Sequence, residues 1–199
     1  MTERRNLDQV KREAASCRNC DLWRRATQTV FGAGPVSARM VLVGEQPGDE
    51  EDIQGEPFVG PAGRALDRAL QEAGIDRAGV YVTNAVKHFK WEPGPGDKRI
   101  HKKPNISEQH ACRPWLDAEL SIIRPEVVIC MGATATQALF GREVSVLRDR
   151  GKIFRPEFAP LAMLTVHPSS ILRTRTDEER HAARTAFARD LREAVRQLS

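Results

Sequence analysis

The stretch MVLVGEQPG, residues 40–48, decides the fold class, because it joins a purely apolar run to a polar turn flanked by glycines. The run lacks the alternation of polar and apolar residues that marks a half-exposed strand, so it predicts a strand buried on both faces of a sheet. Three more runs of the same kind follow along the chain: Val80–Val82, Val127–Met131 and Leu161–Val166.

Segments with helical spacing separate these runs. The first begins at Gly60-Pro61 and ends at Gly74, and others are expected over residues 106–123 and 133–140. The last begins at the capping box Thr176–Glu179. Its inward-facing residues are expected to be Phe187, Leu191, Val195 and Leu198. Strands that alternate with helices predict an α/β protein: a three-layer α/β/α sandwich around a central, mostly parallel four-stranded sheet.

The composition fits one domain, residues 1–199, with a single core. Hydrophobic residues make up 40% of the chain and charged residues 29%, as in ordinary globular proteins. No apolar run approaches the length of a membrane span, and residues 1–15 lack the apolar segment of a secretory signal. We therefore expect a cytoplasmic protein with no membrane partner. In that reducing compartment the four cysteines are more often metal ligands or buried thiols than disulfides.

Polar residues follow three of the predicted strands at the point where each ends. Gly44-Glu45-Gln46 follows the first run, Asn84 the second and His167 the fourth. Ligands of parallel sheets bind beyond the carboxyl ends of the strands, so a carboxylate, an amide and an imidazole are expected to converge there. An amide can pair with the edge of a nucleobase, and an imidazole can donate to a pyrimidine carbonyl.

The segment from Lys87 to Lys103 concentrates positive charge. It holds six lysines and arginines against two acids, and the whole chain carries a net charge of +4. The Pro/Gly-rich break Glu92–Gly96 inside it predicts an exposed loop. Such a segment suits the phosphates of a nucleic acid, although a solvated loop can have the same composition.

In combination, six short motifs resemble those of a known family. They are GEQPG from Gly44, GEPFVGPAGRALDRAL from Gly55, YVTNAVKHFK from Tyr81, CRPWL from Cys112, GATA from Gly132 and HPSSILR from His167. The chain resembles the uracil-DNA glycosylase superfamily in its iron–sulfur, family-4 branch. It is more similar still to the UdgX subgroup, which is marked by Gln after Glu in the first motif and by a basic insertion that ends Arg-Ile-His, here Arg99-Ile100-His101.

The resemblance implies a role in cleaving uracil from DNA for several residues of these motifs. Glu45 stabilises positive charge on the sugar C1′, and His167 stabilises negative charge on the departing base. Phe58 stacks on the flipped uracil, and Asn84 reads its edge. Further residues of the uracil-binding set are Gly44 and Gln46, and the expected DNA contacts are Arg99, Lys102, Ser169 and Ser170. Each residue has a structural alternative, such as a turn residue for Glu45 or a core aromatic for Phe58.

His101 carries the most specific implication of the UdgX resemblance. There the corresponding histidine attacks C1′ and leaves the protein covalently bonded to uracil-containing DNA, single- or double-stranded. A neutral imidazole is a competent nucleophile, and a tethered one competes with water through its effective concentration. Two rivals stay open: an ordinary hydrolytic family-4 enzyme, and a module that binds uracil-DNA without chemistry. Glu45 argues against the module, and the chain is expected to be a monomer.

The cysteines predict a metal site near the N-terminus. Cys17-Arg18-Asn19-Cys20 is a CxxC unit, whose spacing lets two thiolates meet one metal centre. The family resemblance adds Cys112 and His88 and implies a 4Fe–4S cluster. Cys130 lies in an apolar run and is interpreted as a buried thiol, although counting alone would make it the fourth ligand. Zinc suits the same three thiolates and one imidazole.

Overall fold

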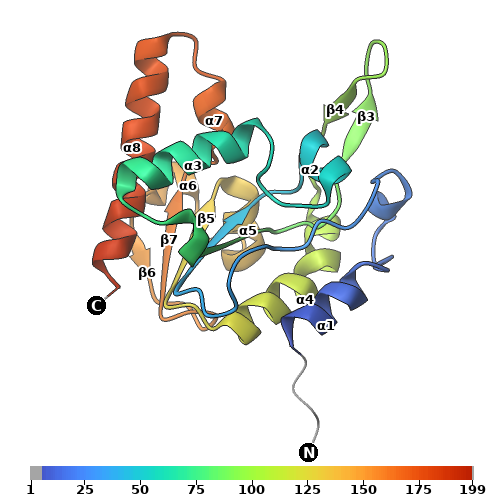
Figure 1. Ribbon diagram of the computed structural model, residues 1–199, viewed down its shortest axis with the longest axis horizontal. Helices are drawn as coiled ribbons and strands as arrows, with labels where there is room; N and C mark the ends of the chain where they lie inside the picture. Colours follow the sequence, from blue (N-terminus) through green and yellow to red (C-terminus); the bar gives the residue numbers. More distant parts are fainter. Residues whose placement is uncertain (1–5, 199) are drawn as a thin grey trace, which may run out of the picture.

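The computed structural model describes residues 6–198, and its centre is a five-stranded sheet of order β2-β1-β5-β7-β6 (Figure 1). The four parallel strands are the four apolar runs expected from the sequence, and the α/β sandwich is confirmed. Their bounds are Met40–Gly44 for β1, Val80–Asn84 for β2, Val127–Met131 for β5 and Leu161–Thr165 for β7.

A fifth strand, β6 (Ile153–Phe154), was not expected. It pairs antiparallel with β7 at the edge of the sheet, Ile153 opposite Met163 and Phe154 opposite Ala162. Two residues carry no periodicity, so this strand forms because β7 offers it a free edge rather than because of its own sequence.

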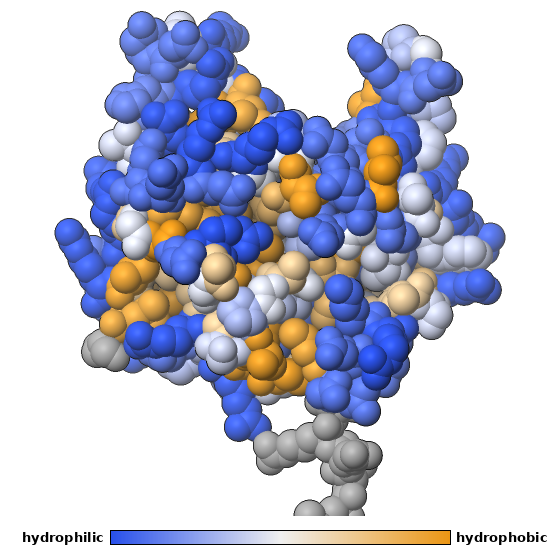
Figure 2. All heavy atoms as spheres, viewed as in Figure 1, coloured by the Kyte–Doolittle hydropathy of each residue, from blue (hydrophilic) through white to orange (hydrophobic). Residues whose placement is uncertain are grey.

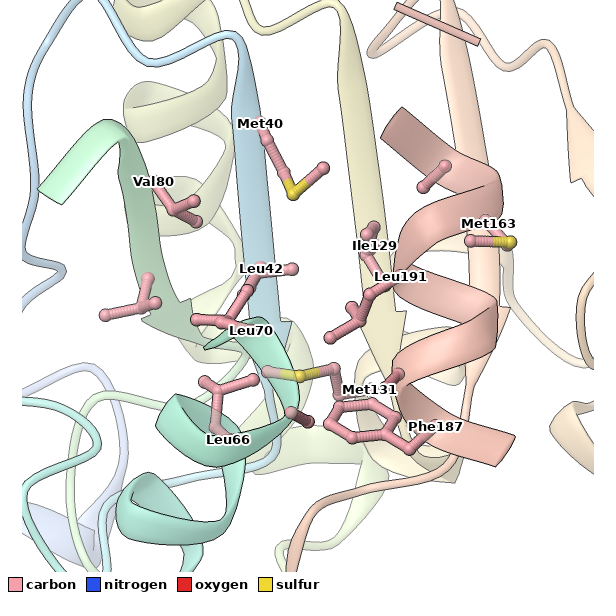
Figure 3. Close-up of a cluster of buried hydrophobic side chains, with 14 of the residues drawn as sticks. Met40, Leu42, Leu66, Leu70, Val80, Ile129, Met131, Met163, Phe187 and Leu191 are labelled. Carbon is pink, nitrogen blue, oxygen red and sulfur yellow. The ribbon is translucent and has the colours of Figure 1, made fainter. Parts of the chain in front are cut away.

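Helices cover both faces of the sheet (Figure 1). On one face lie α3 (Pro61–Ala73), α7 (Ser169–Leu172) and α8 (Asp177–Arg196), and Figure 3 shows apolar side chains of α3 and α8 packed against the sheet. On the other lie α4 (Ile106–Ile123) and α5 (Ala133–Phe140), with α1 (Leu7–Ala14) packed on α4. The shorter helices are α2 (Asp49–Gln54), α6 (Val146–Asp149), η1 (Asp21–Arg24) and η2 (Arg77–Gly79).

The last helix begins at its predicted capping box, in which Thr176 accepts from the Glu179 backbone. Phe187 and Leu191 are fully buried, as expected, but Val195 is 37% exposed. The prediction for Val195 was wrong because an α-helix has 3.6 residues per turn, so its buried positions are spaced by three residues as often as by four. Ala194, three residues after Leu191, takes the buried position instead.

The stretch expected to be an exposed loop is a β-hairpin. Strands β3 (Trp91–Pro93) and β4 (Arg99–His101) pair antiparallel, with Trp91 opposite His101. The turn closes with the Gly94 N–H donating to the Lys98 carbonyl at 2.9 Å. The hairpin projects from the body of the protein (Figure 1). No helix among residues 6–198 has both the length and the apolar character needed to cross a membrane; residues 1–5 of the charged N-terminal stretch lie outside the described residues.

Candidate active site

A cavity of about 860 Å³ opens at the carboxyl ends of the parallel strands. The molecular surface is hollowed between the end of the molecule that carries α7 and α8 and the hairpin (Figure 2). The sheet therefore brings together the side chains expected to converge, and the hairpin adds one more. The predicted residues that line the cavity are Glu45, Gln46, Phe58, Asn84, His101, His167, Ser169 and Ser170.

Glu45 is held by two groups from other elements. Its Oε2 accepts a short hydrogen bond from Thr134 Oγ1, at the start of α5, and its Oε1 lies 3.5 Å from His101 Nε2. Thr134 is fully buried, so it holds the Glu45 carboxylate from the protein interior. The Glu45 side chain itself stays 23% exposed. Sequence reasoning missed Thr134, although its place directly after β5 was a usable signal.

His167 lines the cavity and has a buried ring nitrogen without a partner among the described residues. Its Nδ1 accepts from the Ser169 N–H at 3.2 Å and lies 2.8 Å from Ser169 Oγ. A backbone N–H can only donate, so the ring proton belongs on Nε2. Burial lowers the pKa of His167 to about 4, and the charges of Arg173 and His101 act in the same direction. The imidazole is therefore neutral at pH 7, and among residues 6–198 its buried Nε2 has no hydrogen-bond partner.

This lowered pKa predicts a specific dependence of stability on pH. Between pH 6.5 and about 4 the unfolded chain protonates this histidine and the folded one does not. The free energy of unfolding should therefore fall as the pH falls through that window, by at most about 1.4 kcal/mol per pH unit for one proton. Urea titrations of wild type and His167→Gln would measure the difference in slope. Identical slopes in the two proteins would contradict the lowered pKa.

Asn84 and Phe58 complete the floor of the cavity around Gly44. Asn84 ends β2 and is 3% exposed, and the Phe58 ring centroid lies 6.2 Å from that of His167. A Cβ at Gly44 would come within 2.6 Å of Phe58 Cζ and would collide with the Asn84 amide, so glycine permits the close approach. Phe58 has a φ of 60°, a conformation that costs free energy and recurs at binding sites.

Gln46 points to the hairpin rather than leaving its amide free for a base. Its Nε2 donates to the carbonyls of Lys90 and Lys102 at 3.2 and 3.0 Å, and its Oε1 accepts from the Lys90 N–H at 3.1 Å. The side chain is 6% exposed. Gln46 therefore ties the turn after β1, which carries Glu45, to the base of the hairpin that carries His101.

Arg99 reinforces the same attachment. Its guanidinium contacts Asp49 and Asp52 of α2 at 2.5 Å each, and the side chain is 17% exposed. Asp52 is fully buried and also accepts from the Thr27 N–H at 3.0 Å, so it joins α2, the hairpin and the N-terminal segment. Arg99, expected to contact DNA, is thus occupied within the protein, and Asp52 was not anticipated from the sequence.

The basic stretch is divided by the fold. Lys87 is fully buried, with its Nζ 2.6 Å from Glu119 Oε2 and 2.8 Å from the Asn84 carbonyl, so it does not belong to a basic surface. Lys102 pairs with Glu92 at 2.8 Å on the hairpin. Ser169 and Ser170 line the cavity as expected, but both hydroxyls bond to His167.

None of the predicted metal ligands lines the cavity; three of them are cysteines from the N-terminal segment and α4. Cys112 accepts from the Lys87 N–H and Cys17 from the Trp115 indole N–H, both at 3.1 Å. Cys20 packs in the same small apolar cluster as Cys112. Burial raises the pKa of Cys112 to about 12, and charge on the nearby Cys20 and Cys17 adds to the rise. Cys130 is separate and fully buried in the core, as predicted.

His88, the fourth predicted ligand, has a ring nitrogen without a partner among the described residues. The residue is 4% exposed, and its Nε2 lies 2.9 Å from Thr29 Oγ1. Its buried Nδ1 makes no hydrogen bond to any residue in the range 6–198. Over that range, no three Cys, His, Asp or Glu side chains converge on a point as ligands of one metal ion would. A cubane cluster binds each ligand through a different iron, so it suits donors spread around a larger volume.

Comparisons with known proteins agree on one family. A sequence profile described as "Uracil DNA glycosylase superfamily" matches residues 31–192. The type-4 uracil-DNA glycosylase of Thermotoga maritima is 38% identical over 175 residues, 87% of this chain and 87% of the relative. That of Archaeoglobus fulgidus is 36% identical and covers 84% and 83%, and that of Pyrobaculum aerophilum is 33% identical and covers 94% and 91%. With the profile spanning the sheet and every strand-end residue of the cavity, the chain belongs to the uracil-DNA glycosylase superfamily.

Proposed function

We propose that the protein releases uracil from DNA by breaking the N-glycosidic bond of a deoxyuridine turned into the cavity. The observation that carries this proposal is the unpaired Nε2–H of His167, buried beside Asn84 and Phe58. An aromatic face, an amide and a neutral N–H donor are what a flat base with carbonyl edges requires. The type-4 names of the relatives support the same reaction.

The two charged ends of the reaction match two groups of the cavity. As the C1′–N1 bond breaks, the electron pair leaves with the base and negative charge grows on the uracil O2. The Nε2–H of His167 donates to that oxygen without losing its proton, since the imidazole is already neutral. Positive charge grows on the sugar, and Glu45, fixed by Thr134, stabilises it. Groups that are already oriented stabilise developing charge without a cost of reorganisation.

We further propose that His101, rather than water, captures C1′. The support is its Nε2, 3.5 Å from the Glu45 carboxylate that stabilises the cation. The imidazole lone pair forms the new N–C1′ bond once the base has left and the cation has formed, and the product is an alkylated imidazolium beside Glu45. Gln46 and Arg99 hold the hairpin so that the nucleophile is already in place, which raises its effective concentration.

One experiment tests both levels of this proposal. The protein is mixed with a uracil-containing oligonucleotide, boiled in detergent and run on a denaturing gel, while free uracil is measured by chromatography. Free uracil with an equal amount of adduct supports glycosylase action with capture. Free uracil with an abasic site and no adduct leaves the glycosylase and refutes the capture. DNA binding without free uracil refutes the enzyme and favours a binding module.

We also propose that Cys17, Cys20, His88 and Cys112 hold a 4Fe–4S cluster, with the N-terminal segment as part of one domain. The support is the group of neighbouring thiols, two of which accept N–H bonds, and the unpartnered Nδ1 of His88. The cluster would tie the N-terminal segment to α4 and to the end of β2. Burial raises the pKa of Cys20 and of Cys112, so these two thiols keep their protons until a metal replaces them.

The cluster predicts a brown protein with about four irons per chain. Cys112→Ser and His88→Ala should lose iron and lower the free energy of unfolding, whereas Cys130→Ala should keep the iron. Iron analysis and visible absorbance of protein purified without oxygen measure both. A colourless protein with one zinc per chain, or iron lost from Cys130→Ala but kept in His88→Ala, would contradict the ligand assignment.

A further inference from the structure

Two of the leucines that line the cavity are exposed: Leu172, at 43%, and Leu147, which stands almost wholly in water. Leu147, on the short helix α6, is 99% exposed and lines the cavity together with its neighbour Val146. Val146 is buried, so α6 faces the core on one side and presents Leu147 on the other. Isolated apolar residues on a surface are ordinary, but this one stands at the entrance to the candidate active site.

The segment around Leu147 is held firmly. The Asp149 carboxylate accepts from the Ser145 N–H at 3.0 Å, and it pairs with Arg148 at 3.0 Å and with Lys152 at 2.9 Å. Arg148 also donates to the Glu143 carbonyl at 2.5 Å. Leu147 is therefore exposed on a segment that hydrogen bonds and ion pairs hold in place, and not on a loosely held loop.

A second hollow of about 210 Å³ adjoins the cavity at this segment. Lys103, Ala133, Ser145 and Val146 line both spaces, so the two adjoin. The second hollow also receives Arg142. Neither Lys103 nor Arg142 forms an ion pair or a side-chain hydrogen bond with any residue from 6 to 198, in contrast to Arg99 and Lys102. Two uncommitted cations thus face a polar hollow beside the active site.

We propose that residues 141–149 and Lys103 bind the DNA strand on one side of the extruded deoxyuridine. This inference rests on the proposed glycosylase function. A strand with one nucleotide turned into the cavity leaves the neighbouring base unstacked at the mouth, and Leu147 covers its exposed face. The next phosphate then lies over the second hollow, where Lys103 and Arg142 neutralise it. The positive charge of the second hollow and its place next to the cavity favour the same strand as its occupant.

The test measures uracil release in a single turnover from an oligonucleotide with one central deoxyuridine, at increasing protein concentration. Leu147→Ala should raise the half-saturating concentration about 10-fold, the order expected for losing a buried leucine side chain. Lys103→Ala/Arg142→Ala should lower the slope of log affinity against log salt by about 1.4, the value for two contacts on a single strand. The control Lys11→Ala/Arg12→Ala removes the same charge from exposed positions of α1, which packs on α4 and lines neither hollow, and should match wild type.

Neutral phosphates make the assignment specific. Replacing each flanking phosphate in turn by a methylphosphonate should weaken wild type at one position, and the same replacement should cost Lys103→Ala/Arg142→Ala nothing further. The inference is wrong if Leu147→Ala and the double variant both bind as wild type does. It is also wrong if the double variant stays as sensitive as wild type to the methylphosphonate replacements. If wild type releases no uracil from any substrate, the proposed function itself fails, which is a different result.

Discussion

Glu45→Ala is expected to lose both uracil release and the protein–DNA adduct, whereas His101→Ala is expected to lose the adduct alone. The carboxylate stabilises the cationic sugar, on which either product depends, so its removal should slow bond cleavage by on the order of 10²- to 10³-fold. The histidine acts only after the cation forms. Removing it leaves Glu45 and its Thr134 hydrogen bond in place.

In His101→Ala, the product depends on what occupies the space that the imidazole leaves. The His101 side chain is 49% exposed, so water reaches the position beside Glu45 once the imidazole is gone. His101→Ala should then release uracil slowly and leave an abasic site in place of the adduct. The measurements are free uracil by chromatography and adduct on a denaturing gel. In wild type, the sugar remnant should map to the peptide that contains His101; an adduct at full yield in His101→Ala would end this mechanism.

Lys87→Met is expected to lower the free energy of unfolding by about 3–5 kcal/mol, because it leaves a carboxylate buried without its counter-charge. Lys87 and Glu119 are both fully buried and 2.6 Å apart. Glu119 also accepts from the Tyr81 hydroxyl at 2.9 Å and from the Gly32 N–H at 3.0 Å, but these neutral donors do not replace the ammonium. Urea unfolding of the purified protein, followed by circular dichroism, measures the loss.

Two further variants separate burial from charge. Lys102→Met breaks the exposed pair with Glu92, whose side chains are 44% and 58% exposed, and should lower the free energy of unfolding far less than Lys87→Met, because water screens the pair. Lys87→Met/Glu119→Gln removes both charges and should recover part of the loss. A cost for Lys87→Met no larger than that for Lys102→Met would show that the buried pair does not stabilise the fold as argued.

The sequence by itself determined the sheet and the place of the site. Runs without polar alternation, such as Val127–Met131, have one stable environment in a soluble protein, a strand covered on both faces. Parallel strands have their carboxyl ends at one edge of the sheet. Identifying the strands was therefore enough to predict that Glu45, Asn84 and His167 lie close together. Local patterns were enough here because they fix which way each element faces. They failed for Val195 and the two-residue strand β6, where the pattern is ambiguous or too short.

Only the tertiary structure decided which partner each polar side chain takes. Lys87 belongs to the basic stretch in sequence, yet it pairs with Glu119, 32 positions away, in the core. Gln46 bonds the hairpin backbone 44 and 56 positions away, and the Nδ1 contacts of His167 determine which ring nitrogen faces the cavity. Lys103 and Lys102 are identical neighbours, and only the fold leaves one of them unpaired at the cavity. A residue type states what a side chain can bond, but the bond it makes depends on which distant groups the packed chain brings within about 3 Å.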